Sequence, residues 1–424
     1  MLGNQLPRLL HGTPGTPLTL AQHESAFAAT SSGSDLLSEL EASGLTGRGG
    51  AAFPTGRKAR LLAEQRGHHK YVVVNAMEGE PASHKDQTLL STNPHLVLDG
   101  AEMLASIIGA DQVMVCVARD RPSIVNYVKR ALHERERKAR RSVKFELHTP
   151  PWRYVAGEES ALVHWLDDNE SLPQYRPLRP TILKLNRHPV LVDNAETCAN
   201  VALIGRFGAK WFRELGTEQS PGSALISLSG AVARPLVIEA ALGTPIRTIL
   251  DVGGADPSPQ AVLLGGYGGT WLSGKNLDVP YDNTRLSEFG ATTGAGVMVV
   301  LGREGCGLVE TTRVVKWMAN ESARQCGPCA FGLPALGEDL TELSFSTSTS
   351  STAFNRLVER CGVINGRGAC RHPDGVVRFV RSALDVFGED VKQHARGVPC
   401  SATRSRKRYA TVPMLEREEE LIWE

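Results

Sequence analysis

YVVVNA at residues 71–76 opens the stretch that decides the fold. This short β-branched run, like QVMVCVA at 112–118, is typical of a buried strand. LVLDGAEMLASIIGA at 96–110 and IVNYVKRALHERERKARR at 124–141 repeat apolar residues at helical spacing, and VKFELHT at 143–149 returns to a strand pattern. The alternation of strands and helices predicts an α/β protein with an open, mainly parallel sheet.

The composition is that of an ordinary soluble globular protein of 424 residues, enough for roughly two to four domains. The 47 Lys and Arg nearly balance the 46 Asp and Glu, which argues against a nucleic-acid partner held by charge. No stretch approaches the roughly 18 apolar residues of a membrane helix, and the first residues lack the apolar core of a signal peptide. We therefore expect a cytoplasmic protein without a transmembrane segment, whose eight cysteines serve metal or redox chemistry.

Sequence patterns divide the chain into five parts. Residues 1–40 are rich in Gly, Pro, Ser and Thr and predict a flexible arm. The α/β pattern fills 41–215, short strands punctuated by Gly and Pro fill 222–300, and helical periodicity returns at 305–398. We expect the mixed-charge residues 399–424 to form a mobile tail.

GLTGRGGAAFPTGRK at 44–58 is the first stretch that suggests chemistry. Its glycines let the backbone approach a ligand, and Arg48, Arg57 and Lys58 add positive charge, which suits a phosphate or a flavin phosphate. The stretch lacks the Gly-Lys-Ser/Thr ending of a P-loop, and a Gly-rich surface turn explains the same residues equally well.

Two further stretches place acids beside a predicted strand or helix. YVVVNAMEGEPASHKD at 71–86 puts polar groups beyond a strand end, where open α/β sheets bind ligands. These polar residues are Asn75, Glu78, Glu80 and Asp86. YVAGEESAL at 154–162 puts Glu158 and Glu159 at a helix start. Acids in both stretches could contact a ligand or cap the next helix, and capping is the simpler explanation in the second.

QCGPC at 325–329 has the chelating spacing CxxC, and Cys370 follows in the same helical region. Thiolates select zinc or iron–sulfur clusters, and both are compatible with this spacing. Cys361 or His372 could complete a site of four ligands. The motif follows a long helix rather than a strand, which argues against a thioredoxin-like redox pair. We expect Cys116 and Cys198 to be buried inert thiols. Cys306 and Cys400 have no assigned role.

These four stretches occur in one order, joined by LVDNAETCANV at 191–201, SLSGAVARP at 227–235 and LGTP at 242–245. Together they resemble the NADH-oxidising flavoprotein subunit of respiratory complex I and the diaphorase subunits of NAD-linked hydrogenases and formate dehydrogenases. The resemblance implies an α/β fold with a Rossmann-like FMN domain, then a small β-grasp domain of the soluble-ligand-binding type, then a C-terminal helical domain holding a [4Fe-4S] cluster.

The resemblance also implies a function and a set of site residues. Electrons would pass from NADH or NADPH through FMN to the cluster, and on to an iron–sulfur protein or a membrane reductase, so the protein would be peripheral to a membrane through its partner. The implied FMN site comprises Gly47, Arg48, Gly49, Lys58, Asn75, Glu78, Tyr154, Gly157, Glu158, Glu159, Asp193, Asn194 and Thr197. The implied nucleotide contacts are Phe53, Glu80, Glu159 and Arg179. The implied cluster ligands are Cys326, Cys329 and Cys370.

This chain departs from the family pattern in each site. Met77 stands where the family usually has an acid, and Asp193 replaces the first of two Asn residues. Leu61 and Arg179 occupy positions where aromatic side chains would stack on the adenine. Lost stacking weakens dinucleotide binding, since an aromatic pair contributes roughly 0.5–1.5 kcal/mol. A group of arginines could instead recognise the 2′-phosphate of NADPH, namely Arg57, Arg60, Arg176 and Arg179.

Ala323 replaces the cysteine that the family places three positions before Cys326. Three thiolates could hold a cluster with one iron open to another ligand, Cys361 or His372 could take the fourth place, or the site could be empty or hold zinc. We favour a cluster, because the other spacings match. Two other functions are compatible with these departures: a degenerate structural or docking subunit, and a zinc-bearing regulatory protein. Electron flow in the reverse direction, from ferredoxin to the flavin, would use the same residues.

Overall fold

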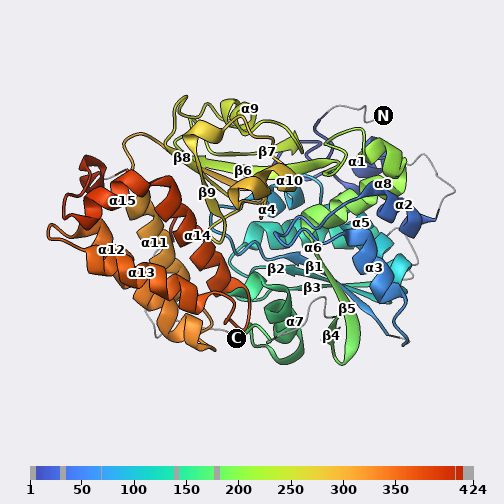
Figure 1. The fold of residues 1–424 in the computed structure, drawn as a ribbon. Helices are drawn as coiled ribbons and strands as arrows, with labels where there is room; N and C mark the ends of the chain where they lie inside the picture. Colours follow the sequence, from blue (N-terminus) through green and yellow to red (C-terminus); the bar gives the residue numbers. More distant parts are fainter. Residues whose placement is uncertain are drawn as a thin grey trace.

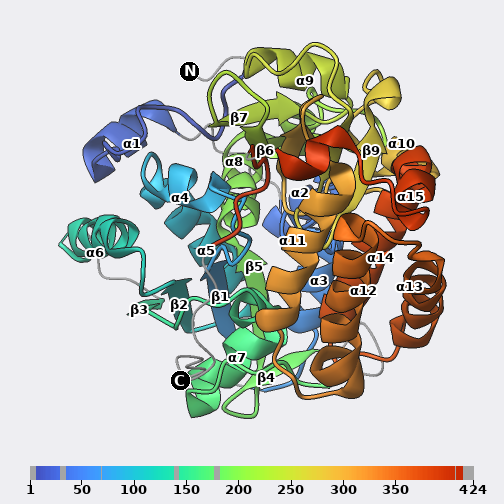
Figure 2. The same ribbon diagram turned by 90° about the vertical axis from the view of Figure 1, so that its left-hand side faces the viewer.

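The computed structural model describes residues 6–28, 35–67, 69–137, 143–175, 182–405 and 407–413. Two five-stranded sheets and a helical bundle form the molecule, and Figure 1 shows the bundle at one end, beside both sheets. Figure 2 shows the same arrangement from the side of the bundle. Among the described residues, no helix combines the length and the apolar character that crossing a membrane requires.

The first sheet has the strand order β3-β2-β1-β5-β4. Its first four strands are parallel, and β4 pairs antiparallel with β5 at the edge, which confirms the open, mainly parallel sheet. The strands are β1 (Tyr71–Ala76), β2 (Gln112–Val117), β3 (Lys144–His148), β4 (Leu183–Leu185) and β5 (His188–Asn194). The helices of this part are α2 (Leu36–Ser43), α3 (Thr55–Ala63), α4 (Lys85–Leu90), α5 (Pro94–Ile108), α6 (Pro122–Glu136), α7 (Glu159–Asp168) and α8 (Ala195–Phe212).

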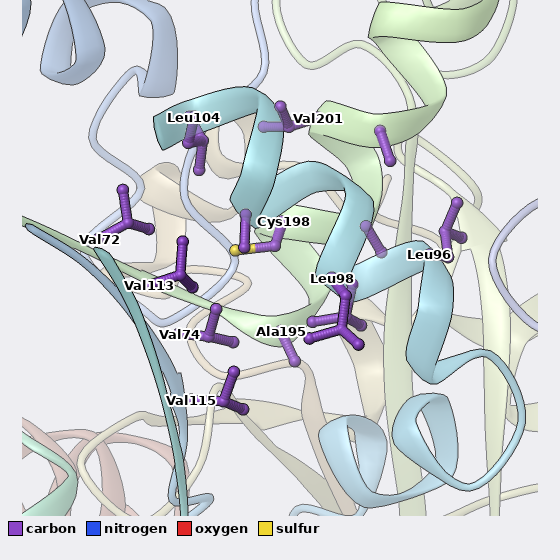
Figure 3. Packing of buried hydrophobic residues seen from close by; sticks show 14 of the residues in the cluster. Val72, Val74, Leu96, Leu98, Leu104, Val113, Val115, Ala195, Cys198 and Val201 are labelled. Carbon is purple, nitrogen blue, oxygen red and sulfur yellow. The ribbon is translucent and has the colours of Figure 1, made fainter. Parts of the chain in front are cut away.

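Helices α5 and α8 pack together on one face of this sheet, over the alternating side chains Val72 and Val74 of β1 (Figure 3). Their close approach depends on Gly100, because a Cβ at this position would lie 1.7 Å from the carbonyl oxygen of Cys198. Cys198 and Cys116 are both fully buried, and burial raises the pKa of each thiol, as expected for inert core cysteines.

The second sheet has the order β7-β6-β10-β8-β9, in which only β6 and β10 are parallel neighbours. The short helix α9 packs against this sheet through Ile246, Ile249 and Leu250, which are buried in the same cluster as the strand residues. This arrangement is a small β-grasp domain. Its elements are β6 (Ser223–Gly230), β7 (Leu236–Ala241), α9 (Ile246–Val252), β8 (Ala261–Leu264), β9 (Thr270–Ser273), α10 (Asn283–Leu286) and β10 (Val297–Leu301).

The C-terminal helices form a bundle whose buried face is continuous with one face of the β-grasp sheet. Trp271 of β9 stacks on Phe379, with ring centroids 5.8 Å apart, and its indole N–H donates to Thr311 Oγ1 at 3.0 Å. The bundle consists of α11 (Gly307–Asn320), α12 (Leu333–Phe345), α13 (Ser351–Ile364), α14 (His372–Val386) and α15 (Gly388–Ala395). A single π-helical turn, η4 (Pro328–Gly332), precedes α12.

The N-terminal segment differs from the flexible arm expected from its composition. In its described residues, 6–28 and 35–40, Leu9, Phe27 and Leu40 are almost completely buried in the core of the first sheet and its helices. The Arg8 guanidinium lies 3.7 Å from the ring centroid of Trp211 and donates to its carbonyl oxygen. A few large side chains thus anchor a segment whose Gly, Pro, Ser and Thr content suggested mobility.

The described part of the C-terminal tail is also packed rather than free. The backbone N–H groups of Tyr409 and Ala410 lie 3.3 and 3.1 Å from Glu310 Oε2 on α11. The hydroxyl of Tyr267 donates to the carbonyl oxygen of Thr411. Residues 414–424 lie outside the described residues.

Candidate functional site

The candidate site lies where β1 and β5 end side by side. Asn75 and Asn194 are register partners in these parallel strands, so both side chains leave the sheet at its carboxyl edge. Asn75 Nδ2 donates to the carbonyl oxygen of Gly157 at 2.9 Å, which fixes the loop before α7 against this edge. Asn194 caps α8 by accepting from the backbone N–H and the hydroxyl of Thr197.

The Gly-rich loop lies over the start of α8, because the backbone N–H of Arg48 donates to Thr197 Oγ1 at 2.9 Å. A Cβ on Gly47 or Gly49 would make only ordinary contacts with the protein, of 3.7 and 3.6 Å. The fold therefore does not require glycine at either position, whereas close approach of a bound group does. The loop and the first turn of α8 form a cradle that suits a phosphate.

The Arg48 side chain does not complete this cradle as expected. Its guanidinium is buried and donates to Thr46 Oγ1 at 3.2 Å and to the carbonyl oxygen of Pro221 at 3.3 Å. Burial lowers the pKa of Arg48 below its ordinary value. Arg48 thus holds the loop to the segment just before β6, and only its backbone faces the helix start.

Lys58 and Asp193 form a charged pair beneath the same edge. Lys58 Nζ lies 3.1 Å from Glu159 Oε1 and 3.6 Å from Asp193 Oδ1, and it donates to the carbonyl oxygen of Val192. Burial lowers the pKa of Lys58, but the two carboxylates outweigh burial and leave this pKa above its ordinary value. Burial raises the pKa of Asp193 to about 6, against the effect of Lys58.

Asp193 Oδ2 is a polar atom of the site without a hydrogen-bond partner. It is buried and makes no hydrogen bond, which is costly for a carboxylate oxygen. A bound group that donates an N–H or O–H would satisfy this oxygen, and a flavin carries such donors on its ring and its ribityl chain. The residues at this edge therefore fit FMN: a glycine cradle, a helix start, a lysine and an unsatisfied acceptor.

Two acids expected in the FMN site are occupied in capping. Glu78 accepts from the backbone N–H groups of Asp86 and Gln87 at 2.9 and 3.1 Å, so it stabilises the start of α4. Glu158 accepts from the backbone N–H groups of Ser160 and Ala161 and caps α7. Capping was the simpler explanation for Glu158 in the sequence, and it holds for Glu78 as well.

Glu80 makes a separate polar contact, the Glu80 contact, between the first-sheet part of the chain and the β-grasp domain. Its Oε2 accepts from the backbone N–H of Tyr267 at 2.8 Å, and the hydroxyl of Tyr154 also interacts with it. Gly266 makes this approach possible, because a Cβ there would lie 2.5 Å from Glu80 Oε2. Burial raises the pKa of Glu80 to about 7, against the effect of its hydrogen bonds. The run GGYGG at 265–269, which the sequence prediction overlooked, is the signal for the Glu80 contact.

The expected nucleotide contacts are only partly described. Phe53 is half-buried, with the Arg57 guanidinium 5.9 Å from its ring centroid. Arg60 is paired with Glu41 through two contacts of 2.5 Å. Arg176 and Arg179 lie outside the described residues.

The three expected cluster ligands come together at the end of the bundle nearest the first sheet. Cys329 lies in η4, and burial together with the nearby thiols of Cys326 and Cys370 raises its pKa. Burial raises the pKa of Cys370 to about 11, and Glu158 and Cys326 contribute to this shift. The three sulfur atoms are not all within 4.8 Å of one another. A single zinc ion requires sulfur atoms about 4 Å apart, whereas a cluster, with several metal atoms between its ligands, holds them farther apart.

The two candidates for the fourth ligand differ in their surroundings. Cys361 is buried in the helical core, where burial raises its pKa to about 11 and the nearby charge is Arg381 rather than a thiol. His372 uses Nε2 to donate to the carbonyl oxygen of Met318 at 2.9 Å, while its buried Nδ1 has no partner. Burial lowers the pKa of His372 to about 4, so the ring is neutral. Cys361 is thus not placed with the other three thiols, and Ala323 offers no ligand atom.

Comparison with known proteins agrees with this geometry. Residues 40–203 match the family described as the Nuo51 FMN-binding domain. Residues 310–394 match the NADH-ubiquinone oxidoreductase-F iron-sulfur binding region. The first match covers the glycine cradle and both strand ends. The second covers the three expected cluster ligands, Cys326, Cys329 and Cys370.

Similar proteins extend over most of the chain. The F subunit of NADH-quinone oxidoreductase in Streptomyces coelicolor is 32% identical over 382 residues, which are 86% of this chain and 84% of the relative. The NADP-reducing hydrogenase subunit HndC of Solidesulfovibrio fructosivorans is 28% identical over 89% of this chain and 79% of its own length. A crystal structure of an air-oxidised NAD+-reducing [NiFe]-hydrogenase contains a chain with 27% identity and a TM-score of 0.77. The match covers 88% of this chain but 65% of that longer chain.

Proposed function

Because the chain belongs to the family of NADH-quinone oxidoreductase F subunits, we propose that it accepts electrons from a reduced nicotinamide nucleotide through FMN and passes them to a [4Fe-4S] cluster. The loop that starts at Arg153 supports this proposal, because it borders both sites. Its Tyr154 N–H donates to Glu321 Oε2 at 3.1 Å, just before the cysteine motif, and the Tyr154 ring lies 5.5 Å from His372, just after Cys370. A flavin at the strand ends and a cluster on the cysteines would therefore be neighbours.

Side chains at the edge of the first sheet would hold the flavin. The backbone of the loop at Gly47 and Gly49 and the start of α8 would bind the phosphate, with no bulky side chain in the way. Asp193 Oδ2 would accept a hydrogen bond from the bound group, and Lys58 would keep this acid ionised and in place. Bound FMN would supply the chemistry that the side chains lack, two-electron uptake from a nicotinamide and one-electron release.

Cys326, Cys329 and Cys370 would hold the cluster, and no cysteine would ligate the fourth iron. The position of Cys361 in the helical core argues against it as a replacement. Cys329 lies in a π-helical turn, a feature often found at functional sites. A ligand other than cysteine makes one corner of such a cluster exchangeable.

The nucleotide would bind between Phe53 and Glu80. We propose NADH as the preferred donor, because Arg60 is already paired with Glu41 and leaves one arginine fewer for a 2′-phosphate. The HndC relative is named as NADP-reducing. The experiment should therefore compare flavin reduction by NADH with flavin reduction by NADPH. Electrons would leave to an iron–sulfur protein or a membrane reductase, as expected for a subunit of a larger assembly.

The visible spectrum of the full-length protein, purified without oxygen, tests this function. We expect a yellow-brown protein that releases FMN on denaturation and contains iron and acid-labile sulfide. NADH should bleach the flavin absorbance faster than NADPH does. Equal or faster reduction by NADPH would overturn the donor preference alone. A colourless protein that cannot be reconstituted with FMN would overturn the function and identify a structural subunit.

A further inference from the structure

A second group of metal-binding side chains lies at the opposite end of α11 from the expected cluster. One ligand atom from each of Cys306, His394 and Cys400 lies within 4.8 Å of the other two. Cys306 precedes the first turn of α11, His394 is in the last turn of α15, and Cys400 precedes η5 (Ser401–Arg404). Neither matching family description nor the proposed electron path gives these residues a role.

The hydrogen bonds of His394 orient it as a ligand. Its Nδ1 lies 3.1 Å from the carbonyl oxygen of Ser344, which can only accept, so Nδ1 carries the proton. Nε2 then carries the lone pair, which accepts from the backbone N–H of Cys400 at 3.1 Å and lies 3.9 Å from Cys306 Sγ. A metal ion between the three side chains would replace the Cys400 N–H at this lone pair. A histidine that donates its other ring N–H to a backbone carbonyl is the usual arrangement at metal sites, where it fixes the tautomer and the ring orientation.

Burial and spacing both suit one small ion. His394 is completely buried and Cys306 is 3% exposed, while Cys400 is partly exposed. Metal–ligand bonds of about 2.0–2.3 Å in a tetrahedron place ligand atoms about 3.5–4 Å apart, close to the observed spacing. The cysteines of the CxxC motif do not meet the same distance limit, so the two groups differ in the size of the centre they can hold.

We propose that Cys306, His394 and Cys400 bind a single Zn²⁺ ion, with water in the fourth position on the partly exposed side of Cys400. Two thiolates and one imidazole are ligands that zinc prefers, and two thiolates neutralise its charge. Zinc would displace a proton from each thiol on binding. The ion would join the starts of α11 and η5 to the end of α15.

The zinc would act as a clip for the described part of the C-terminal tail. After Cys400 the chain crosses to Glu310 on α11, and Thr411 accepts from the hydroxyl of Tyr267. The backbone N–H of Tyr267 in turn donates to Glu80 Oε2. Fixing Cys400 therefore limits the movement of the segment that holds Tyr267, the partner of Glu80.

Metal analysis of the full-length protein, purified without oxygen and with its flavin and cluster, tests the site. We expect about one zinc per chain in addition to the cluster iron. Cys306→Ser and Cys400→Ser should each lower zinc at least tenfold and leave iron and acid-labile sulfide unchanged. Cys361→Ser is the matched control, because it removes a buried thiol of the same bundle and should keep both metals.

Four results would overturn the zinc site. The first is that reduced wild-type protein takes up no zinc when it is incubated with Zn²⁺. The second and third are that Cys400→Ser keeps its zinc, or that only Cys329→Ser loses it. The fourth is a Cys306–Cys400 disulfide in peptide maps of freshly purified protein. Hydrogen exchange of wild-type protein avoids the risk that a variant misfolds. Chelation of the zinc should speed exchange in residues 396–413 at least tenfold, and unchanged exchange there would overturn the clip.

Discussion

Glu80→Gln offers a test of the Glu80 contact between the first-sheet part of the chain and the β-grasp domain. Burial raises the pKa of Glu80 from 4.5 to about 7, so the folded protein resists ionisation of this acid while the unfolded chain does not. Ionisation of Glu80 therefore lowers the free energy of unfolding. This cost is small below the pKa of Glu80 in the unfolded chain, grows as the pH rises from that pKa to the pKa in the folded protein, and is constant above about pH 7. From these two values the cost is about 1 kcal/mol at pH 5 and about 3 kcal/mol at pH 8.

Glutamine removes this cost and keeps one oxygen to accept from the N–H of Tyr267. The difference in free energy of unfolding between Glu80→Gln and wild type should therefore shift in favour of the variant by about 2 kcal/mol between pH 5 and pH 8. The change of this difference with pH is more informative than its value at one pH. A lost hydrogen bond would lower the free energy of unfolding by the same amount at every pH. Urea unfolding of the full-length protein at pH 5, 6, 7 and 8 measures it.

Glu338→Gln is the matched control, since this exposed glutamate of α12 should show no such trend. A difference between Glu80→Gln and wild type that stays within about 0.5 kcal/mol from pH 5 to pH 8 would refute the reasoning. It would mean that Glu80 titrates as an ordinary exposed acid, and that Tyr267 and Gly266 do not close over it.

Three further substitutions test the flavin and cluster sites. Ala323→Cys should supply the missing thiolate and slow the loss of iron in air severalfold, whereas equal rates of iron loss would show that the fourth corner is already filled. Lys58→Met should weaken FMN binding at least tenfold, about 1.4 kcal/mol, because Asp193 loses the cation that keeps it ionised; titration of apoprotein with FMN measures this, and unchanged affinity would count against the pair. Gly49→Ala should leave the free energy of unfolding within about 0.5 kcal/mol of wild type yet lower FMN affinity at least tenfold, and a variant that binds FMN normally would show that the cradle is not occupied.

The sequence predicted the elements with strong local patterns. The strands β1 and β2 are buried on both faces, so their continuous apolar runs identify them. The strand β4 has three residues, too few to show a pattern, and the antiparallel edge of the sheet was therefore not foreseen. The packed N-terminal segment was missed because Leu9 and Phe27 are isolated among residues typical of loops.

The site could be predicted only in part, for similar reasons. Asn75, Lys58, Asp193 and Asn194 do meet at the strand ends, because parallel topology brings these ends together. The sequence could not show that the carboxylate of Glu78 accepts hydrogen bonds from the start of α4. A capping acid and a ligand-binding acid have the same sequence pattern. Cys306, His394 and Cys400 form no recognisable metal-binding motif in the sequence. They lie at the ends of separate helices and meet only in the folded bundle.

The loop at Arg153 and Tyr154 limits how the molecule can move. Arg153 pairs with Glu321 at 3.3 Å, and Glu321 also accepts from the Tyr154 N–H, with both charged side chains nearly inaccessible to water. A hinge rotation of the bundle away from the first sheet would separate these charges in a poorly hydrated place, at a cost of several kcal/mol. We therefore expect the donor and acceptor of an electron to keep a fixed separation through the catalytic cycle, and a nucleotide to enter by local side-chain movement rather than by domain opening.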